Sequence, residues 1–134
     1  MCGFLGKISL DSFSDENLVN ANNRIICRGP DETKYLNQNN LDTNKIFFSF
    51  VFNRLSIIDL TDKASQPMTS KNKENLMMFN GEIYNYKELK EILLSKGITF
   101  NSKNSDTEVL LEGLSVFGLD FINNIIGQFA IVFY

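Results

Sequence analysis

The second residue of the chain, Cys2, has the chemistry of a nucleophile that carries its own base. Removal of Met1 would leave Cys2 with a free α-amine, whose unperturbed pKa of about 7.7–8.0 lies well below the value of about 10.4 for lysine. A base that titrates near the working pH is efficient, so one terminal residue can supply both nucleophile and base. The alternative is a small buried cysteine near the start of a strand, which position alone favours.

The absence of histidine from the sequence narrows the chemistry further. Without an imidazole, neither a Ser–His nor a Cys–His pair can form within this chain. With only Cys2 and Cys27 and no histidine, a zinc site is not expected either. If the chain is an enzyme, its general base is therefore another group, and the α-amine of Cys2 fits that requirement.

Asn80, Gly81 and Glu82 form a second feature with two interpretations. Asn-Gly between apolar runs is typical of the tight turn of a β-hairpin, because both residues tolerate positive φ. The functional interpretation is an oxyanion hole, in which an Asn side-chain N–H and a Gly backbone N–H point at one oxygen atom. Taken alone, the motif favours the turn.

Arg54 and Asp106 could hold the two charged ends of an α-amino acid. The planar fork of Arg54 can bind a carboxylate at two points, and Asp106 can pair with an ammonium group. Each residue also has a structural interpretation. Arg54 could form a salt bridge, and Asp106 could stabilise the first turn of a helix through the helix dipole.

Strands and helices must position these residues, and the spacing of apolar and turn-forming residues predicts where they lie. Asn80-Gly81 is predicted to join two strands as a hairpin, and the chain is predicted to reverse near Asn53. Ser105 is predicted to cap a helix with Glu108 in a capping box, and Asn85 to cap the helix before it. The predicted strands are 3–10, 46–52, 54–59, 75–79, 82–84 and 129–134; the predicted helices are 15–26, 86–96 and 106–117; residues 28–31 form a turn and 37–45 a loop.

Composition excludes several classes of protein. The net charge of −3 argues against nucleic acid or an anionic membrane as partner, since both are usually met by a basic patch. No apolar stretch approaches the roughly 18–20 residues of a membrane span. The start of the chain lacks the pattern of a signal peptide, and two cysteines are too few for a disulfide scaffold. A cytoplasmic location is therefore expected.

The last six residues, 129–134, are all apolar. Such a run is typical of a central strand with neighbours on both sides and layers above and below. A chain end at Tyr134 would place a free carboxylate at the tip of this strand, and burying that charge is costly. We therefore expect the sequence to be a piece of a longer protein and its 134 residues to form one domain that is incomplete at its C-terminal side.

Seven segments, in a constant order, connect these residues to one family. They span the whole chain and are Met1–Gly3, Arg28–Asp31, Arg54–Leu60, Gln66–Met68, Phe79–Tyr86, Ser105–Leu111 and Gly127–Tyr134. In these segments the chain resembles the class II glutamine amidotransferases and, among them, the glutamine-hydrolysing asparagine synthetases. The resemblance implies that residues 1–134 are a partial type 2 glutamine amidotransferase domain from the N-terminal end of such an enzyme.

The resemblance also implies a fold and a role for individual residues. The fold would be α+β, the four-layer αββα sandwich of the N-terminal-nucleophile hydrolases. Cys2 would attack the glutamine carboxamide to form a thioester, while Asn80 and Gly81 hold the oxyanion. The implied substrate contacts are Arg54 at the carboxylate, Glu82 and Asp106 at the ammonium end, and Leu55, Ser56, Ile57 and Ile58 along the pocket.

The implied reaction is hydrolysis of L-glutamine to glutamate and ammonia, with no metal or cofactor in this chain. In the family, ammonia passes to a C-terminal synthetase domain that uses ATP and Mg²⁺ to make asparagine from aspartate, and this sequence contains no such segment. The resemblance leaves a homodimer open. The alternatives are a non-catalytic remnant that binds glutamine or regulates a partner, and a structural domain without a ligand; intact Cys2, Arg54 and Asn80 disfavour both.

Overall fold

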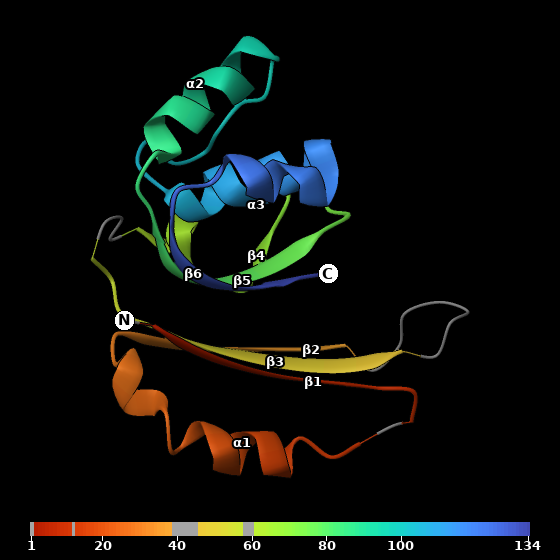
Figure 1. Ribbon diagram of the computed structural model, residues 1–134. Helices are drawn as coiled ribbons and strands as arrows, with labels where there is room; N and C mark the ends of the chain where they lie inside the picture. The colour runs from red at the N-terminus through yellow and green to blue at the C-terminus, as the bar shows by residue number, and fades with distance from the viewer. Residues whose placement is uncertain (1, 12, 39–45, 58–60) are drawn as a thin grey trace. The chain divides into compact units, whose positions relative to one another are not determined.

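A computed structural model describes residues 2–11, 13–38, 46–57 and 61–134. The chain divides into two compact units, residues 1–55 and residues 56–134. Each unit contains a three-stranded antiparallel sheet together with helical segments (Figure 1). The predicted mixture of helices and strands is therefore confirmed as two antiparallel sheets with helices.

The sheet of the first unit is centred on one apolar strand. Its strands are β1 (Gly3–Ser9), β2 (Glu32–Gln38) and β3 (Phe47–Arg54), in the order β1-β3-β2. β3 is buried from Phe48 onward, because a strand pairs with each of its edges and its aromatic side chains are shielded from water. Helix α1 (Glu16–Asn22) lies along one face of this sheet (Figure 1). A short 3₁₀ segment, Ile26–Arg28, then leads to β2.

Buried amides attach α1 to the sheet of the first unit. The Asn53 side-chain N–H donates to Asn22 Oδ1 at 2.6 Å, and the Thr33 hydroxyl donates to Asn53 Oδ1 at 2.9 Å. Asn22 in turn donates to the Tyr35 hydroxyl at 3.1 Å. Asn22 and Asn53 are both fully buried, so these bonds satisfy groups that would otherwise be costly to desolvate.

Several predictions for the first unit are wrong in detail. The helix ends at Asn22 rather than at residue 26. The chain does not reverse near Asn53, because β3 runs through Asn53 to Arg54 between two pairing strands. Of the predicted strand 54–59, residues 55–57 do not form a strand, and residues 58–60 lie outside the described residues. β2 was missed; it includes residues 37–38 of the predicted loop, whose remainder also lies outside the described residues.

The second unit places helices over one sheet. Its strands are β4 (Met68–Thr69), β5 (Leu76–Ile83) and β6 (Gly127–Phe133), in the order β4-β5-β6, after a 3₁₀ turn at Asp62–Ala64. Helix α3 (Asp106–Phe117) covers a face of this sheet, and helix α2 (Tyr86–Ser95) packs on α3 (Figure 1). A 3₁₀ segment, Gly118–Asn124, leads from α3 to β6. The core includes Met77, Phe79, Leu93, Leu110 and Leu111.

The predicted hairpin at Asn80-Gly81 is wrong. Asn80 and Gly81 lie inside β5, whose eight residues all stay extended and whose last seven pair with β6 in one register. β6 lies more than forty residues further along the chain, so no local sequence pattern predicts that it pairs with β5. The paired partner and the buried residues that flank the motif outweigh the turn preference of the Asn-Gly dipeptide. Among the described residues, β6 pairs only with β5.

The ends of the long helices agree largely with prediction. Ser105 caps α3, since its hydroxyl oxygen accepts from the Glu108 N–H at 3.1 Å. Gly97 follows α2 and Gly118 ends α3, both with positive φ, as expected for a chain leaving a helix. Asn85 makes no side-chain cap; instead it joins the start of α2 to the approach to β6, accepting from the Ile126 N–H at 3.0 Å.

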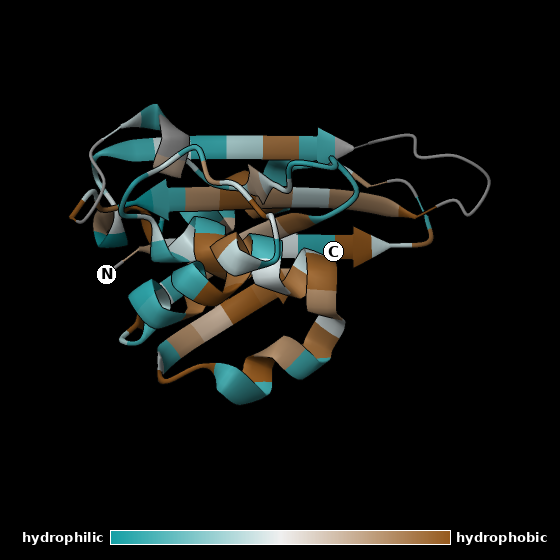
Figure 2. Cartoon of the chain, turned by 90° about the horizontal axis from the view of Figure 1, so that it is seen from above, coloured by the Kyte–Doolittle hydropathy of each residue, from teal (hydrophilic) through white to brown (hydrophobic). Residues whose placement is uncertain are grey.

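Hydrophobic and hydrophilic stretches are interspersed along the ribbon of both units (Figure 2). Within the described ranges, no helix is both long and apolar enough to cross a membrane.

Two buried glutamates on α3 hold neighbouring loops. Glu108 accepts from the backbone N–H groups of Asn101 and Ser102 at 2.7 and 2.8 Å, instead of completing the predicted capping box. Glu112, one turn later, accepts from the Lys71 N–H at 2.9 Å. Burial raises the pKa of Glu112 above 4.5, the nearby Glu108 carboxylate adds to the rise, and the Lys71 N–H and ammonium oppose it.

We predict that Glu112→Gln changes the pH dependence of stability. A carboxyl whose pKa is higher in the folded state favours folding below its unfolded pKa, and this contribution is lost as pH rises through the folded pKa. Urea unfolding from pH 4 to 8 should therefore show the free energy of unfolding of the wild type falling, relative to Glu112→Gln, above pH 4.5. A difference between the two proteins that stays constant with pH would contradict the assignment.

Candidate functional site

Cys2 lies directly before β1, at the end of β3 where the first unit brings several of the predicted residues together. The β1–β3 register pairs Gly3 with Asn53, which places Cys2 beside the residues that follow β3. The Leu55 backbone N–H donates to Cys2 Sγ at 3.3 Å, and Sγ lies 3.7 Å from the Leu55 carbonyl oxygen. Cys2 is half-buried, and both polar backbone groups of Leu55 contact its sulfur.

The turn after α1 contributes residues whose role the sequence did not indicate. Arg28 Nε donates to the Cys2 carbonyl oxygen at 3.1 Å, and the Asp31 N–H donates to the Arg54 carbonyl oxygen at 3.1 Å. Gly29 packs so closely on Asn53 and Arg54 that a Cβ would clash with their backbone. The Arg-Gly-Pro-Asp segment was singled out as a motif, yet only the folded chain shows that it meets both Cys2 and the end of β3.

Arg54 is buried at the end of β3 and forms a salt bridge, as its structural interpretation predicts. Its Nη1 lies 3.5 Å from Oε2 of Glu32, which faces it in the β2–β3 register. Arg54 is 7% exposed, whereas the Glu32 side chain is 36% exposed. A cation with so little contact with water retains a strong preference for a carboxylate.

β5 carries the three residues of the Asn-Gly-Glu motif in the second unit. Asn80 is half-buried, while Gly81 and Glu82 are exposed. A Cβ at Gly81 would clash with the backbone of Gln128 and Phe129 in β6, so glycine is required here by a close approach of two strands and not by a turn. The motif therefore presents polar groups from a straight, paired strand.

Asp106 is the first residue of α3 and joins that helix to β5. Its Oδ2 accepts from the Ile83 N–H at 3.2 Å, and its Oδ1 accepts from the Thr107 N–H at 2.8 Å. Burial raises the pKa of the Asp106 carboxyl above 3.8, and these hydrogen bonds offset only part of the effect. Because Ile83 follows Glu82 directly, the structure brings two of the predicted carboxylates to the same end of β5.

The remaining predicted residues follow β3. Leu55 and Ser56 are half-buried, and Ile57 is 70% exposed. Ile58 lies outside the described residues. The predicted set thus forms one group around Cys2, Arg54 and Leu55 in the first unit and a second group around β5 and Asp106 in the second unit.

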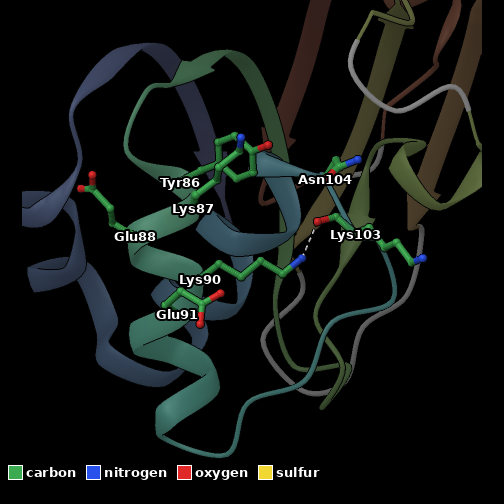
Figure 3. Close-up of a pocket in the computed structure, with 7 residues that line it drawn as sticks. All are labelled: Tyr86, Lys87, Glu88, Lys90, Glu91, Lys103 and Asn104. Atoms are coloured by element: carbon green, nitrogen blue, oxygen red, sulfur yellow. Dashed lines mark hydrogen bonds between the residues drawn. The ribbon is translucent and has the colours of Figure 1, made fainter.

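A pocket of about 420 Å³ on the second unit contains none of the predicted residues. It lies between the start of α2 and the segment before α3, and the Lys90 ammonium crosses it to the Lys103 carbonyl oxygen at 2.6 Å (Figure 3). Lysines and glutamates alternate along its wall, so no single charge dominates it. Among the described residues, no cluster of cysteine and acidic side chains could hold a metal ion.

We predict that Gly81→Ala loosens β6 from β5. The added methyl group must displace the β6 backbone, and overpacking of this kind typically costs about 1–3 kcal/mol. Hydrogen exchange should become faster at β5–β6 ladder amides such as those of Leu76 and Tyr134, which bond across the two strands. Gly97→Ala is the control for a strained glycine away from this ladder, because a methyl there meets open space and its cost comes from the positive φ of Gly97. Equal protection of the ladder in both variants would contradict the prediction.

Comparison with known proteins identifies the family to which the chain is similar. A family model described as a glutamine amidotransferase domain matches residues 1–134, which is the whole chain. Asparagine synthetase [glutamine-hydrolyzing] 1 of Bacillus subtilis is 36% identical over the whole chain, and the second such enzyme of that organism is 34% identical. A probable asparagine synthetase of Dictyostelium discoideum is 30% identical.

The chain covers 21%, 17% and 23% of these three relatives, about a fifth of their length. Similarity over the whole chain, together with the family match, shows that the chain belongs to the glutamine amidotransferase domain family.

Proposed function

We propose that this domain hydrolyses L-glutamine to glutamate and ammonia through a thioester on Cys2. The observation that carries the proposal is the placement of the Cys2 sulfur against the Leu55 N–H, next to the buried cation Arg54. Family membership supports the choice of substrate. The proposal extends to the N-terminal-nucleophile hydrolase fold and to a mature chain that begins at Cys2.

The proposed reaction has two halves. The Cys2 sulfur attacks the carboxamide carbon of glutamine, and the thiol proton passes through the α-amine of Cys2 to the leaving nitrogen. The C–S bond forms and the C–N bond breaks, which releases ammonia and leaves a γ-glutamyl thioester. Water then attacks the thioester and gives a proton to the base, and the returning thiol completes the cycle as glutamate leaves.

Asn80 and Gly81 are the proposed donors to the oxygen that becomes negative in each tetrahedral intermediate. Donors that are already fixed in place stabilise this charge without reorganisation at the moment of reaction. Placement within a strand paired to β6 supports this role, since β5 cannot move its backbone freely. The side-chain amide of Asn80 supplies one N–H and the Gly81 backbone supplies the other.

The α-amino and α-carboxylate groups of glutamine need partners of opposite charge. We assign Arg54 to the carboxylate, with Glu32 as an internal carboxylate that the substrate displaces. Glu82 and Asp106 are assigned to the ammonium end, and Leu55 to Ile58 to the pocket wall. Asp106 serves this role as a carboxylate, so protonation at low pH would weaken it.

The names of the relatives suggest where the ammonia goes. The matched proteins are asparagine synthetases described as glutamine-hydrolysing. We propose that the full-length protein pairs this domain with a C-terminal synthetase domain, which would use ammonia, ATP and Mg²⁺ to make asparagine. A reducing cytoplasm would suit the free thiols of Cys2 and Cys27.

We predict that Cys2→Ala abolishes glutamate release but retains glutamine binding. The change removes the nucleophile and leaves the charged groups that bind the amino acid. Glutamate release is measured in the protein at its natural length, and binding by calorimetry. Cys27→Ala is the matched control. It alters the second free cysteine, which is exposed, and should remain active.

Two outcomes would contradict the proposal. Hydrolysis by the Cys2→Ala protein would refute the thioester mechanism. Glutamine binding without hydrolysis by the wild type would favour the alternative, a glutamine-binding module without catalysis.

We predict that Arg54→Lys weakens glutamine binding by roughly ten- to a hundred-fold. Lysine keeps the charge but loses the planar fork, and loss of part of a charge-assisted bond costs about 1.5–3 kcal/mol. The dissociation constant is measured by calorimetry in the Cys2→Ala background, so that turnover does not interfere.

Glu32→Gln provides the matched control at the same ion pair. It should leave glutamine affinity unchanged or improve it, because Arg54 loses a competing carboxylate. Affinity that drops in Glu32→Gln but not in Arg54→Lys would place the substrate carboxylate elsewhere.

A further inference from the structure

Gln66 belongs to a segment that the sequence analysis singled out and that the proposed reaction does not use. It lies just before β4 and is 5% exposed. The Phe79 N–H donates to Gln66 Oε1 at 2.6 Å, and Gln66 Nε2 donates to the Phe79 carbonyl oxygen at 3.1 Å. Both ends of the Gln66 amide are therefore bonded to one residue of β5, directly before Asn80.

The side chain of Gln66 takes the place of a strand. β4 pairs with β5 through Met68 opposite Met77 and Thr69 opposite Leu76. Continuing this antiparallel register places Gln66 opposite Phe79. A carboxamide presents the same N–H and C=O as a peptide, so the side chain supplies the rung that the backbone does not.

This rung is the last one on the β4 edge before Gly81. Leu76 bonds to Tyr134 and Tyr84 bonds to Ile126, the two residues that flank β6. Because backbone groups alternate between the two edges of an antiparallel strand, the even-numbered residues of β5 face β6, and Phe79 and Gly81 face the other edge. In the part of the chain that the structure describes, β4 does not reach Gly81, and Gln66 bonds only as far as Phe79.

We propose that Gln66 is a positioning residue for the oxyanion donors. By bonding both polar groups of Phe79, it fixes the backbone of β5 immediately before Asn80. Gln66 is also the last partner on this edge of β5. The Gly81 N–H, which points to the same edge, therefore remains available to a substrate oxygen. The inference rests on the proposed function, because it assigns Gln66 to a hole formed by Asn80 and Gly81.

A positioning role and a purely structural role for Gln66 predict different effects on kcat and KM. Glutamine binds through its charged ends, whereas the carbonyl oxygen becomes negative only in the transition state. A small misplacement of Asn80 and Gly81 should therefore lower kcat and leave KM nearly unchanged. An aldehyde analogue of glutamine tests the same point, since the Cys2 thiol adds across its C=O bond and the resulting oxygen occupies the hole.

Ser70 provides a matched control at the other end of the same ladder. The Ser70 hydroxyl accepts from the Asn75 N–H at 3.0 Å, and its one hydrogen is shared between Asn72 Oδ1 at 2.5 Å and the Asn75 carbonyl oxygen at 3.3 Å. Like Gln66, Ser70 is buried and bonds both backbone groups of one residue opposite it. It lies beyond Leu76, at the end of β5 away from Asn80 and Gly81, so Ser70→Ala removes buried side-chain hydrogen bonds of the same ladder without touching the proposed hole.

The experiment compares wild type, Gln66→Leu, Gln66→Asn and Ser70→Ala in the protein at its natural length, below the melting temperature of each. Gln66→Leu removes both bonds, and Gln66→Asn shortens the amide so that it cannot make both. We expect kcat of each Gln66 variant to fall roughly ten- to a hundred-fold, the size expected for a misplaced catalytic group. The inhibition constant of the aldehyde should rise by a similar factor, with KM and the rate of Cys2 alkylation by iodoacetamide within about two-fold of wild type.

Three outcomes would overturn the assignment. Equal losses of kcat in the Gln66 and Ser70 variants would show a general effect of stability. A rise in KM with unchanged aldehyde inhibition would place Gln66 in substrate binding. Wild-type kcat in Gln66→Asn, or in Gln66→Leu, would show that Phe79 needs no such support. A wild-type protein that hydrolyses no glutamine would refute the proposed function itself, which is a different result from any of these.

Discussion

Pairing of β5 on both edges is the interaction on which the second unit depends. β6 bonds to one edge over seven residues, while the other edge is bonded by β4 and then by the side chain of Gln66. Asp106 attaches the start of α3 to the Ile83 N–H at the end of this strand. A backbone bonded on each side can change direction only if several hydrogen bonds break together. Polar groups on β5 are therefore presented by a rigid support, which suits electrostatic catalysis.

Side-chain oxygen atoms complete the second unit where its backbone lacks partners. Glu108 and Glu112 accept from backbone N–H groups of three residues in two loops, and Ser70 and Gln66 complete the ends of a ladder whose strand has only two residues. Leaving buried backbone groups without partners would cost more than these side chains lose on burial. The cost of the arrangement appears in the raised pKa values of Asp106 and Glu112.

The first unit solves a related problem at the end of β3. Its central strand carries the buried amide of Asn53 and the buried cation of Arg54 next to each other, and each is matched, by Asn22 and by Glu32. The Arg28–Asp31 turn then bonds to both Cys2 and Arg54. Three segments that are distant in the sequence thus meet at one strand end, where the Cys2 sulfur accepts from the Leu55 N–H.

The sequence by itself determined the mixture of strands and helices, the long helices and the choice of candidate residues, because these depend on local spacing and residue chemistry. Ser105, Gly97 and Gly118 bound helices where predicted, and Cys2, Arg54 and Asp106 were recognised by what their side chains can do. Tertiary structure alone decided that Asn80-Gly81 is strand, that β2 exists, and that Arg54 faces Glu32. Pairing partners far along the chain settle these points. A residue's own preference for a turn or a strand amounts to at most about 1 kcal/mol, which a paired and buried neighbour readily exceeds.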